Sequence, residues 1–284
     1  MLNQNTKRIY LISLLTTRVN QDVPSAKPFR HAVIDGFLAP EICKELLHDF
    51  PAFEKRYALN EMGEVGNKAV RMDMPDISER YAQLDRFIQS TEFLQRIEQL
   101  TGIPDLLYDP DYIGGGTHEN VQGQDLSPHV DFNVLPKSGW HRRLNLIIYL
   151  NPEWDLGWGG NLELEQDPWN GEDPNKITVL PLLNRCVVFE TNEISWHGFT
   201  EIRLPEAKRH LTRKSIAIYL YTKTRPAEET VVSHGTIYVP RGLPSGVAAV
   251  EVIKETDFDE LRRRFVQLRG QLKYLYKREL EYSA

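Results

Sequence analysis

The segment Pro128-His129-Val130-Asp131-Phe132-Asn133 places two metal-ligand side chains two residues apart. Residues two apart on an extended strand point to the same face, so the imidazole of His129 and the carboxylate of Asp131 would aim at a common point. A third ligand from a distant strand would complete one face of an octahedron. Two histidines and one carboxylate on such a face leave three coordination positions open, and this arrangement suits Fe(II).

His197 is the best candidate for the third ligand. It stands in Ser195-Trp196-His197-Gly198, soon after the run Arg185 to Glu190, which predicts a strand. The competitor His210 lies among basic residues in what reads as a solvated loop. A lone His-x-Asp is weak evidence, because the chain holds 8 histidines and such a pair can also be a surface contact. The metal prediction therefore depends on the rest of the constellation.

Arg213 and Ser215 form a second candidate group, which could bind a carboxylate. A planar guanidinium grips a carboxylate through two parallel hydrogen bonds, which suits the second carboxylate of a 2-oxo dicarboxylate. Arg213 opens the strand-like run to Tyr219, and a period of two places Ser215 on the same face. The alternative is that Arg213 is a surface charge at the edge of a strand.

The order His129-x-Asp131, then His197, then Arg213-x-Ser215 resembles the 2-oxoglutarate and Fe(II)-dependent dioxygenases, in their prolyl-4-hydroxylase-like branch. The resemblance reaches beyond these residues to three further stretches, which are Arg142 to Asn151, Trp158 to Leu164 and Asn184 to Phe189.

The resemblance covers about residues 105 to 224. It implies a double-stranded β-helix fold in which the three ligands form the catalytic iron centre and Arg213 binds the distal carboxylate of 2-oxoglutarate. Tyr149 matches a position where members of the branch often place a tyrosine hydroxyl on the same carboxylate. An ordinary strand aromatic is the other interpretation of Tyr149.

The activity that the resemblance implies uses Fe(II) as cofactor, 2-oxoglutarate and O2 as co-substrates, and ascorbate as a candidate reductant. It would hydroxylate an unactivated C–H bond and release succinate and CO2, and desaturation and ring closure share the same chemistry. Halogenating relatives lack the carboxylate ligand, so Asp131 argues against halogenation. About sixteen residues separate His197 from Arg213, more than is common. Glu201 to Thr212 must then form an extra loop, and Arg209 is an alternative to Arg213.

The substrate is less well specified. Gly114 to Asp125 reads as a loop at the pocket mouth, and His118 and Asn133 would either contact substrate or serve only the fold. We expect a small, amino-acid-like molecule, because the sequence shows no extended peptide groove. A carrier-bound intermediate and a peptidyl (prolyl-type) residue stay open. Two other classes compete: a cupin-like metalloenzyme that does not use 2-oxoglutarate, and a non-catalytic binding protein, against which the intact ligand set argues.

The composition is that of an ordinary soluble globular protein, with 284 residues of which 41% are hydrophobic and 26% charged. The net charge of -6 is spread without a basic patch, so we expect no nucleic-acid partner. Cys43 and Cys186 read as buried apolar residues, which fits a reducing cytoplasm. We interpret Ile9 to Leu15 as a local strand or helix, not a signal peptide, and no run is long enough to span a membrane.

The predicted helices and strands around these residues indicate one α+β domain. It would have a double-stranded β-helix (jelly roll) core with flanking N-terminal and C-terminal helices. Residues 1 to 104 would form a helical support, residues 105 to 224 the core, and residues 225 to 284 an extension with a helix. Helices are predicted over Pro40 to Phe50, Tyr81 to Gln89 and Thr91 to Leu100. Strands are predicted over His31 to Ile34, Arg143 to Leu150, Asn161 to Glu165, Ile177 to Leu180, Arg185 to Glu190 and Ser215 to Thr222.

The C-terminal helix is predicted from Thr256, which fits a capping box with Asp259. An apolar stripe follows at spacings of three and four, formed by Phe258, Leu261, Phe265, Leu268, Leu272 and Leu275. The simpler interpretation is a helix packed on its own domain, and the other is a homodimer seam with coiled-coil spacing. Gly270 weakens both by about 1 kcal/mol.

Overall fold

The computed structural model describes residues 23–60, 62–66, 68–169, 173–240 and 252–283. The predicted element at Ile9 to Leu15 lies outside these residues. Within them, none of the helices combines the length and the apolar composition that a bilayer crossing requires.

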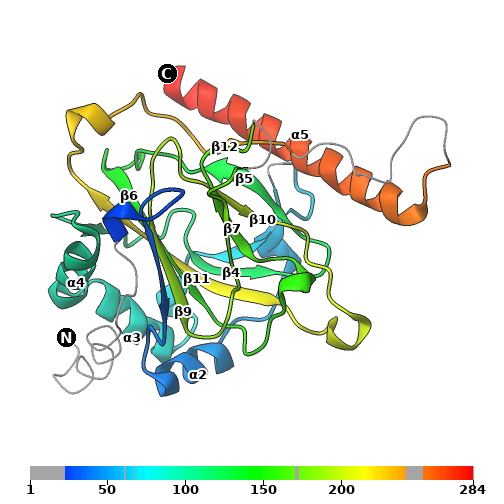
Figure 1. The fold of residues 1–284 in the computed structure, drawn as a ribbon, viewed down its shortest axis with the longest axis horizontal. Coiled ribbons are helices and arrows are strands. Elements are labelled where there is room, and N and C mark those ends of the chain that lie inside the picture. Colours follow the sequence, from blue (N-terminus) through cyan, green and yellow to red (C-terminus); the bar gives the residue numbers. More distant parts are fainter. Residues whose placement is uncertain (1–22, 61, 67, 170–172, 241–251, 284) are drawn as a thin grey trace.

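Two antiparallel sheets form the centre of the molecule (Figure 1). The larger sheet has the order β1 (His31–Asp35), β9 (Arg185–Glu190), β6 (His141–Tyr149), β11 (Arg213–Thr222), β4 (Gly116–Asn120) and β2 (Ala69–Arg71), and β3 (Leu107–Tyr108) also pairs with β11. The smaller sheet has the order β12 (Ile237–Tyr238), β5 (Leu126–Val130), β10 (Trp196–Phe199), β7 (Leu162–Glu165) and β8 (Ile177–Val179).

Three helices cover the outer face of the larger sheet, where Figure 1 shows them gathered on one side. They are α2 (Pro40–His48), α3 (Glu79–Ile88) and α4 (Thr91–Thr101). Pro40 stands in the first turn of α2, and the side-chain oxygens of Ser78 and Ser90 cap α3 and α4. Gly102 ends α4 with a φ of 72°, a left-handed conformation that favours glycine. Short 3-10 turns lie at Val23–Ser25, Lys55–Ala58, Met74–Asp76, Leu156–Trp158, Glu206–Lys208 and Ala227–Glu229.

Alternation along β6 divides the core between the two faces of the larger sheet. Leu146 and Ile148 pack with the helices, whereas Ile147 and Tyr149 face the smaller sheet. The layer between the sheets also contains Phe29, Leu162, Leu164, Val179, Val187 and Phe189. Because both faces of β6 and β9 are covered, these strands read as continuous apolar runs, and the predicted strands at these positions are confirmed.

The segment from Gly114 to Asp125 corrects one prediction. It is not only a loop, since residues Gly116–Asn120 form β4, which is paired between β11 and β2. Gly116 has a φ of 86°, and a Cβ there would lie 2.0 Å from the Arg71 carbonyl oxygen. The glycine therefore permits the close approach of two backbones, which explains a strand that begins with a turn residue.

The C-terminal helix α5 (Glu255–Ser283) lies across the side of the molecule away from α2 to α4 (Figure 1). It is held by polar contacts, since Arg263 bonds to Asp125 and Glu201, and the Thr236 N–H donates to Tyr274. The apolar stripe does not make this contact. Phe258, Phe265, Leu268, Leu272 and Leu275 are all exposed, and Leu261 is partly buried. The helix thus packs on its own domain, as the simpler interpretation expected, but it does so through Gly270 and polar residues and not through the stripe.

Candidate active site

The three predicted metal ligands come together at the smaller sheet. His129 on β5 is the direct partner of His197 on β10, and their ring centroids are 4.2 Å apart. Asp131 follows β5, with Oδ1 3.9 Å from Nε2 of His129 and Oδ2 3.4 Å from Nε2 of His197. Their ligand atoms all lie within 4.8 Å of one another, so strand pairing has placed two nitrogens and one carboxylate around a common point. The competitor His210 is exposed in the loop after β10.

Backbone carbonyls orient both histidines. Nδ1 of His129 lies 3.0 Å from the Ser127 oxygen, and Nδ1 of His197 lies 3.0 Å from the Ser195 oxygen. A carbonyl only accepts, so Nδ1 carries the proton and Nε2 keeps its lone pair toward the centre. Burial, and then the neighbouring His197, lowers the pKa of His129 to about 3, and burial likewise lowers the pKa of His197. Both rings are thus neutral near pH 7 and fit a divalent cation.

Arg142 and Asn145, both on β6, hold the third ligand. Nη2 of Arg142 lies 2.9 Å from Oδ2 of Asp131, and Nδ2 of Asn145 donates to the same oxygen at 2.8 Å. The Arg142 guanidinium also donates twice to Oδ1 of Asn145 and lies 3.5 Å from the centroid of the Tyr219 ring. Burial acts to raise the pKa of Asp131, but Arg142, the two histidines and the Asn145 hydrogen bond together outweigh it and hold that pKa well below its usual range.

Sequence reasoning placed Arg142 and Asn145 in a strand of the resemblance but gave neither of them a role. Arg142 is only 1% exposed, and both side chains belong to a strand whose other residues are mostly apolar. A charged residue is almost never fully buried unless it is paired, so this pattern was the available signal.

The predicted carboxylate-binding group also assembles. Arg213 is buried at the start of β11, where its Nε donates to the Gly160 oxygen at 2.6 Å and its Nη2 lies 3.2 Å from the Tyr149 hydroxyl. Ser215 is the direct partner of Tyr149 across the β11–β6 ladder. The alternative residue Arg209 is exposed in the preceding loop. The buried cation and the two hydroxyls are thus those of Arg213, Tyr149 and Ser215.

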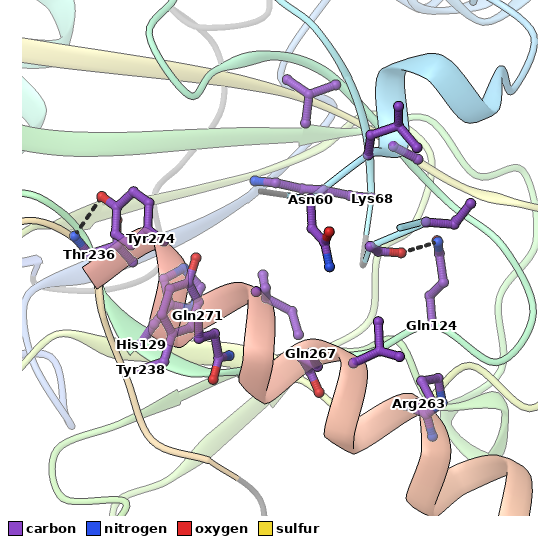
Figure 2. Close-up of a pocket in the computed structure, with 18 of the residues that line it drawn as sticks. Asn60, Lys68, Gln124, His129, Thr236, Tyr238, Arg263, Gln267, Gln271 and Tyr274 are labelled. Atoms are coloured by element: carbon purple, nitrogen blue, oxygen red, sulfur yellow. Dashed lines mark hydrogen bonds between the residues drawn. The ribbon is translucent and has the colours of Figure 1, made fainter. Parts of the chain in front are cut away.

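A cavity of about 1280 Å³ opens from the metal ligands toward α5 (Figure 2). His129, Asp131 and Arg142 line its inner end, and residues from Thr256 to Arg278 line it along the helix. At a rise of about 1.5 Å per residue, that stretch of helix is roughly 33 Å long. The cavity is therefore elongated, and the expectation that the chain has no extended groove is wrong. The missed contribution is α5, whose inner face has too few apolar residues to stand out in the sequence.

His118 and Asn133 are both tied to the backbone of the chain. His118 on β4 is buried, with Nε2 3.1 Å from the Gly114 oxygen. Asn133 donates to the Val232 oxygen and accepts from the His234 N–H. These contacts serve the fold, which is the simpler of the two roles that the sequence allowed.

Comparisons with known proteins agree with this geometry. The family described as the 2OG-Fe(II) oxygenase superfamily matches residues 116–221. The prolyl 3-hydroxylase OGFOD1 of Mus musculus is 27% identical over 214 residues, which are 70% of this chain and 34% of that protein. This chain thus spans about a third of that curated relative.

Two solved structures are also similar. A prolyl hydroxylase of Trichoplax adhaerens, solved with a hypoxia inducible factor peptide fragment, is 15% identical, with a TM-score of 0.48 and coverage of 78% of this chain and 91% of that one. HygX of Streptomyces hygroscopicus, solved with nickel, 2-oxoglutarate and hygromycin B, is 12% identical, with a TM-score of 0.46 and coverage of 72% and 93%.

The family match begins at β4 and runs almost to the end of β11, so it contains every predicted metal ligand and Arg213. These residues occur in the order that the sequence resemblance required, and the structure brings them into two groups, the three predicted ligands and the pair of Arg213 with Tyr149. Residues 116–221 of this chain therefore match the 2OG-Fe(II) oxygenase superfamily, which confirms the resemblance that the sequence predicted.

Proposed function

We propose that this chain is an Fe(II)- and 2-oxoglutarate-dependent dioxygenase, a single domain built on a double-stranded β-helix core. The observation that carries the proposal is the convergence of Nε2 of His129, Nε2 of His197 and the Asp131 carboxylate at the inner end of the cavity. Two antiparallel sheets with an apolar layer between them support the jelly-roll core. The buried, unpaired Cys43 and Cys186 support a reducing compartment such as the cytoplasm.

The donor set fits Fe(II). Two neutral imidazoles and one carboxylate suit a non-haem iron site, and only three protein ligands leave room for other molecules. When bound, the iron would supply O2 activation, with 2-oxoglutarate as the co-substrate that is oxidised to succinate and CO2 and with ascorbate as a reductant that keeps the metal ferrous.

The chain's own residues would bind and orient the reactants. Arg213 and the Tyr149 hydroxyl would take the distal carboxylate of 2-oxoglutarate, with Ser215 beside them, because a buried guanidinium and hydroxyl together favour a carboxylate. Arg142 keeps Asp131 ionised and fixes its position. The β6 and β9 side chains between the sheets exclude water from this end of the cavity. The expected outcome is hydroxylation of an unactivated C–H bond.

The substrate has two candidates. A small, amino-acid-like molecule remains one of them, although the elongated cavity removes the reason for which we preferred it. A peptidyl, prolyl-type residue is the second, and it is favoured by the length of the cavity along α5 and by the similarity to a prolyl 3-hydroxylase. Succinate release, measured with free amino acids and with proline-containing peptides, separates the two.

The experiment that tests the oxygenase proposal is an anaerobic titration of the metal-free protein with Fe(II) and then 2-oxoglutarate. A visible charge-transfer band should appear with the wild type and be absent in His129→Ala. Arg213→Ala should raise the 2-oxoglutarate concentration needed for the band, whereas Arg209→Ala, which alters an exposed arginine, should not. Metal binding without any band would favour the cupin-like alternative instead.

We further propose that the exposed stripe of α5 pairs with a second copy of this chain. In an antiparallel pair, Phe258 would face Leu275 of the other helix and Phe265 would face Leu268, so all six stripe residues find apolar partners. Charge favours this direction. The first turns of α5 carry Glu255, Asp257 and Asp259, and the basic residues Lys273, Lys277 and Arg278 lie toward its other end, before a last turn that has no basic residue.

Sedimentation equilibrium tests the dimer. The wild type should be a dimer at micromolar concentration, and Phe265→Asp should make it a monomer. Gln95→Asp is the control, because Gln95 is also exposed but lies on α4, on the side of the molecule away from α5 (Figure 1). A wild type that stays monomeric across the concentration range would rule out the second copy as the partner of the stripe.

A further inference from the structure

We propose that Lys68 is the residue that binds a carboxylate of the primary substrate, at a subsite separate from the one at Arg213. This inference rests on the proposed oxygenase function, because it assigns the anion to the substrate of that reaction. The source of the carboxylate is either the free carboxylate of an amino-acid-like molecule or the acidic side chain of a polypeptide.

The position of Lys68 points to a ligand. It immediately precedes β2, the strand at the edge of the larger sheet, and it lines the same cavity as His129 and Asp131. Figure 2 shows its side chain reaching into the cavity between the sheet and α5. A substrate that extends from the metal centre along α5 would therefore pass the ammonium group.

The charges around the cavity leave Lys68 without a counter-ion. Arg142 is paired with Asp131, and Arg213 is held by the Gly160 oxygen and the Tyr149 hydroxyl. Among the residues that the structure describes, none forms a hydrogen bond or an ion pair with the Lys68 ammonium. Lys68 is partly exposed to the cavity, and an ammonium that has lost part of its water without gaining a counter-ion favours an anionic ligand.

The electrostatic setting agrees with this geometry. Burial lowers the pKa of Lys68 to about 8, Asp131 acts in the opposite direction, and Arg142 and Arg213 lower the pKa further. The side chain is thus still mostly protonated at pH 7. At the inner end of the cavity, Lys68 and Arg142 accompany the carboxylate of Asp131, and Arg213 is close enough to act on Lys68, so this end favours a ligand with negative charge.

Two amide side chains that line the same cavity, those of Asn60 and Gln271, would add hydrogen-bond donors to the subsite. Asn60 accepts from the Met62 and Glu64 N–H groups through Oδ1, which directs its Nδ2 donor away from that turn. Gly270 of α5 packs against this amide, since a Cβ there would lie 2.9 Å from Nδ2. Gln271, one residue on, lines the cavity with a buried Nε2 that has no partner in the described parts of the chain (Figure 2). One ammonium and two amide donors suit a carboxylate.

Two measurements distinguish whether the carboxylate that Lys68 binds belongs to 2-oxoglutarate, to an amino-acid-like molecule or to the acidic side chain of a polypeptide. The first uses calorimetry to measure 2-oxoglutarate binding to the anaerobic Mn(II)-loaded protein. Lys68→Met should leave this affinity within about twofold, as should the exposed control Lys223→Met, whereas Arg213→Met should weaken it about tenfold or more. An equal loss with Lys68→Met would assign the subsite to the co-substrate and overturn the proposal.

The second arm measures how fast acetic anhydride acetylates Lys68, with the labelled peptide quantified by mass spectrometry. N-acetylglycine should slow the labelling several-fold and its neutral amide should not. N-acetylaspartic acid α-amide tests the acidic side chain as the source. Equal protection by the neutral amide, or none by either acid, would overturn the proposal. Because this arm also works without 2-oxoglutarate, it still reports on Lys68 if the wild type fails to bind that co-substrate and the oxygenase proposal fails.

A folding defect is checked separately. Lys68→Arg keeps the charge and should retain N-acetylglycine binding by calorimetry, whereas Lys68→Met should lose it about tenfold. Loss of binding in both variants with an unchanged melting temperature would mean that the charge of Lys68 is not what binds the anion, and it would contradict the inference.

Discussion

The metal centre and the wall that α5 forms across the cavity follow different rules. At the centre, the sheets supply a partner for each polar group: backbone oxygens accept from His129 and His197, and Arg142 pairs with Asp131. In the cavity between the sheet and this wall, Lys68 beside β2 and Gln271 on α5 direct polar atoms inward, and within the described ranges those atoms have no partner. The centre is therefore complete before a ligand arrives, whereas the wall is completed by the ligand.

That difference predicts opposite responses to mutation. Removing one member of a satisfied buried network leaves its partner without a hydrogen bond or counter-ion. Both the free energy of unfolding and the affinity for the ligand should then fall. Removing an unpartnered polar group relieves a desolvation cost, so stability should hold or rise while ligand binding alone falls. Four measurements, given from the largest expected effect to the smallest, test this difference between the metal centre and the wall.

Asp131→Ala should have the largest effect. It removes one metal ligand and leaves the Arg142 guanidinium, 1% exposed, without its counter-ion. We expect loss of stoichiometric metal binding and about 3–5 kcal/mol less unfolding free energy, measured by metal analysis and urea denaturation. His210→Ala, in an exposed loop, is the control and should change neither. Retained metal in Asp131→Ala would remove this residue from the ligand set.

The variant Arg142→Met removes the cation that pairs with Asp131 and leaves Asp131 itself in place. All three predicted metal ligands remain, but Asp131 loses the cation that fixes its position and keeps it ionised. Metal affinity should fall about 10–100-fold by calorimetry, since groups that orient a ligand typically have effects of that size. Arg203→Met, at a mostly exposed arginine outside the centre, should leave the affinity unchanged. An unchanged affinity in Arg142→Met would show that Asp131 is positioned without it.

The difference between the metal centre and the wall also explains which parts of the structure the sequence predicts. The buried strands β6 and β9 were predictable, because both faces are covered and their central residues are mostly apolar. The convergence of His129, Asp131 and His197 was also predictable, since a period of two aligns the first two and the resemblance supplies the third, whereas the direct pairing of His129 with His197 comes from the structure. Strand β4 was not, because Gly116, Thr117 and His118 carry no apolar alternation, and their strand conformation comes from pairing with β11 and β2.

The outer wall was hidden for a different reason. An apolar stripe usually marks the face of a helix that packs on its own domain, but α5 uses its polar face for that contact. Lys68 stands in a polar stretch with no motif, and its importance appears only when the fold places it beside Asp131 and α5. Tertiary contacts between distant segments are the information that periodicity lacks.

Gly270→Ala should have a moderate effect on the wall. Alanine favours a helix by about 1 kcal/mol, but its Cβ would lie 2.9 Å from Nδ2 of Asn60, and overpacking costs about 1–3 kcal/mol. We expect a net loss of about 1 kcal/mol in thermal unfolding. Lys273→Ala, at an exposed position of α5, reports helix propensity alone and should not destabilise. A clear gain in stability for Gly270→Ala would mean that α5 does not pack closely on Asn60.

Lys68→Met should have the smallest effect, and its sign is opposite to that at the centre. The folded state releases the Lys68 proton near a pKa of about 8, whereas an unfolded lysine holds it to about 10.4. Unfolding between these pH values takes up a proton, so raising the pH favours the folded state. The stability of the methionine variant does not depend on this titration, and the variant avoids the cost of removing the ammonium charge from water. At pH 7 it should melt about 2 °C higher than the wild type, with the gap closing toward pH 10. Lys223→Met, at an exposed lysine, should follow the wild type at every pH. A lower melting temperature for Lys68→Met at pH 7 would show that the ammonium already has a partner within the chain, and the wall would then resemble the metal centre.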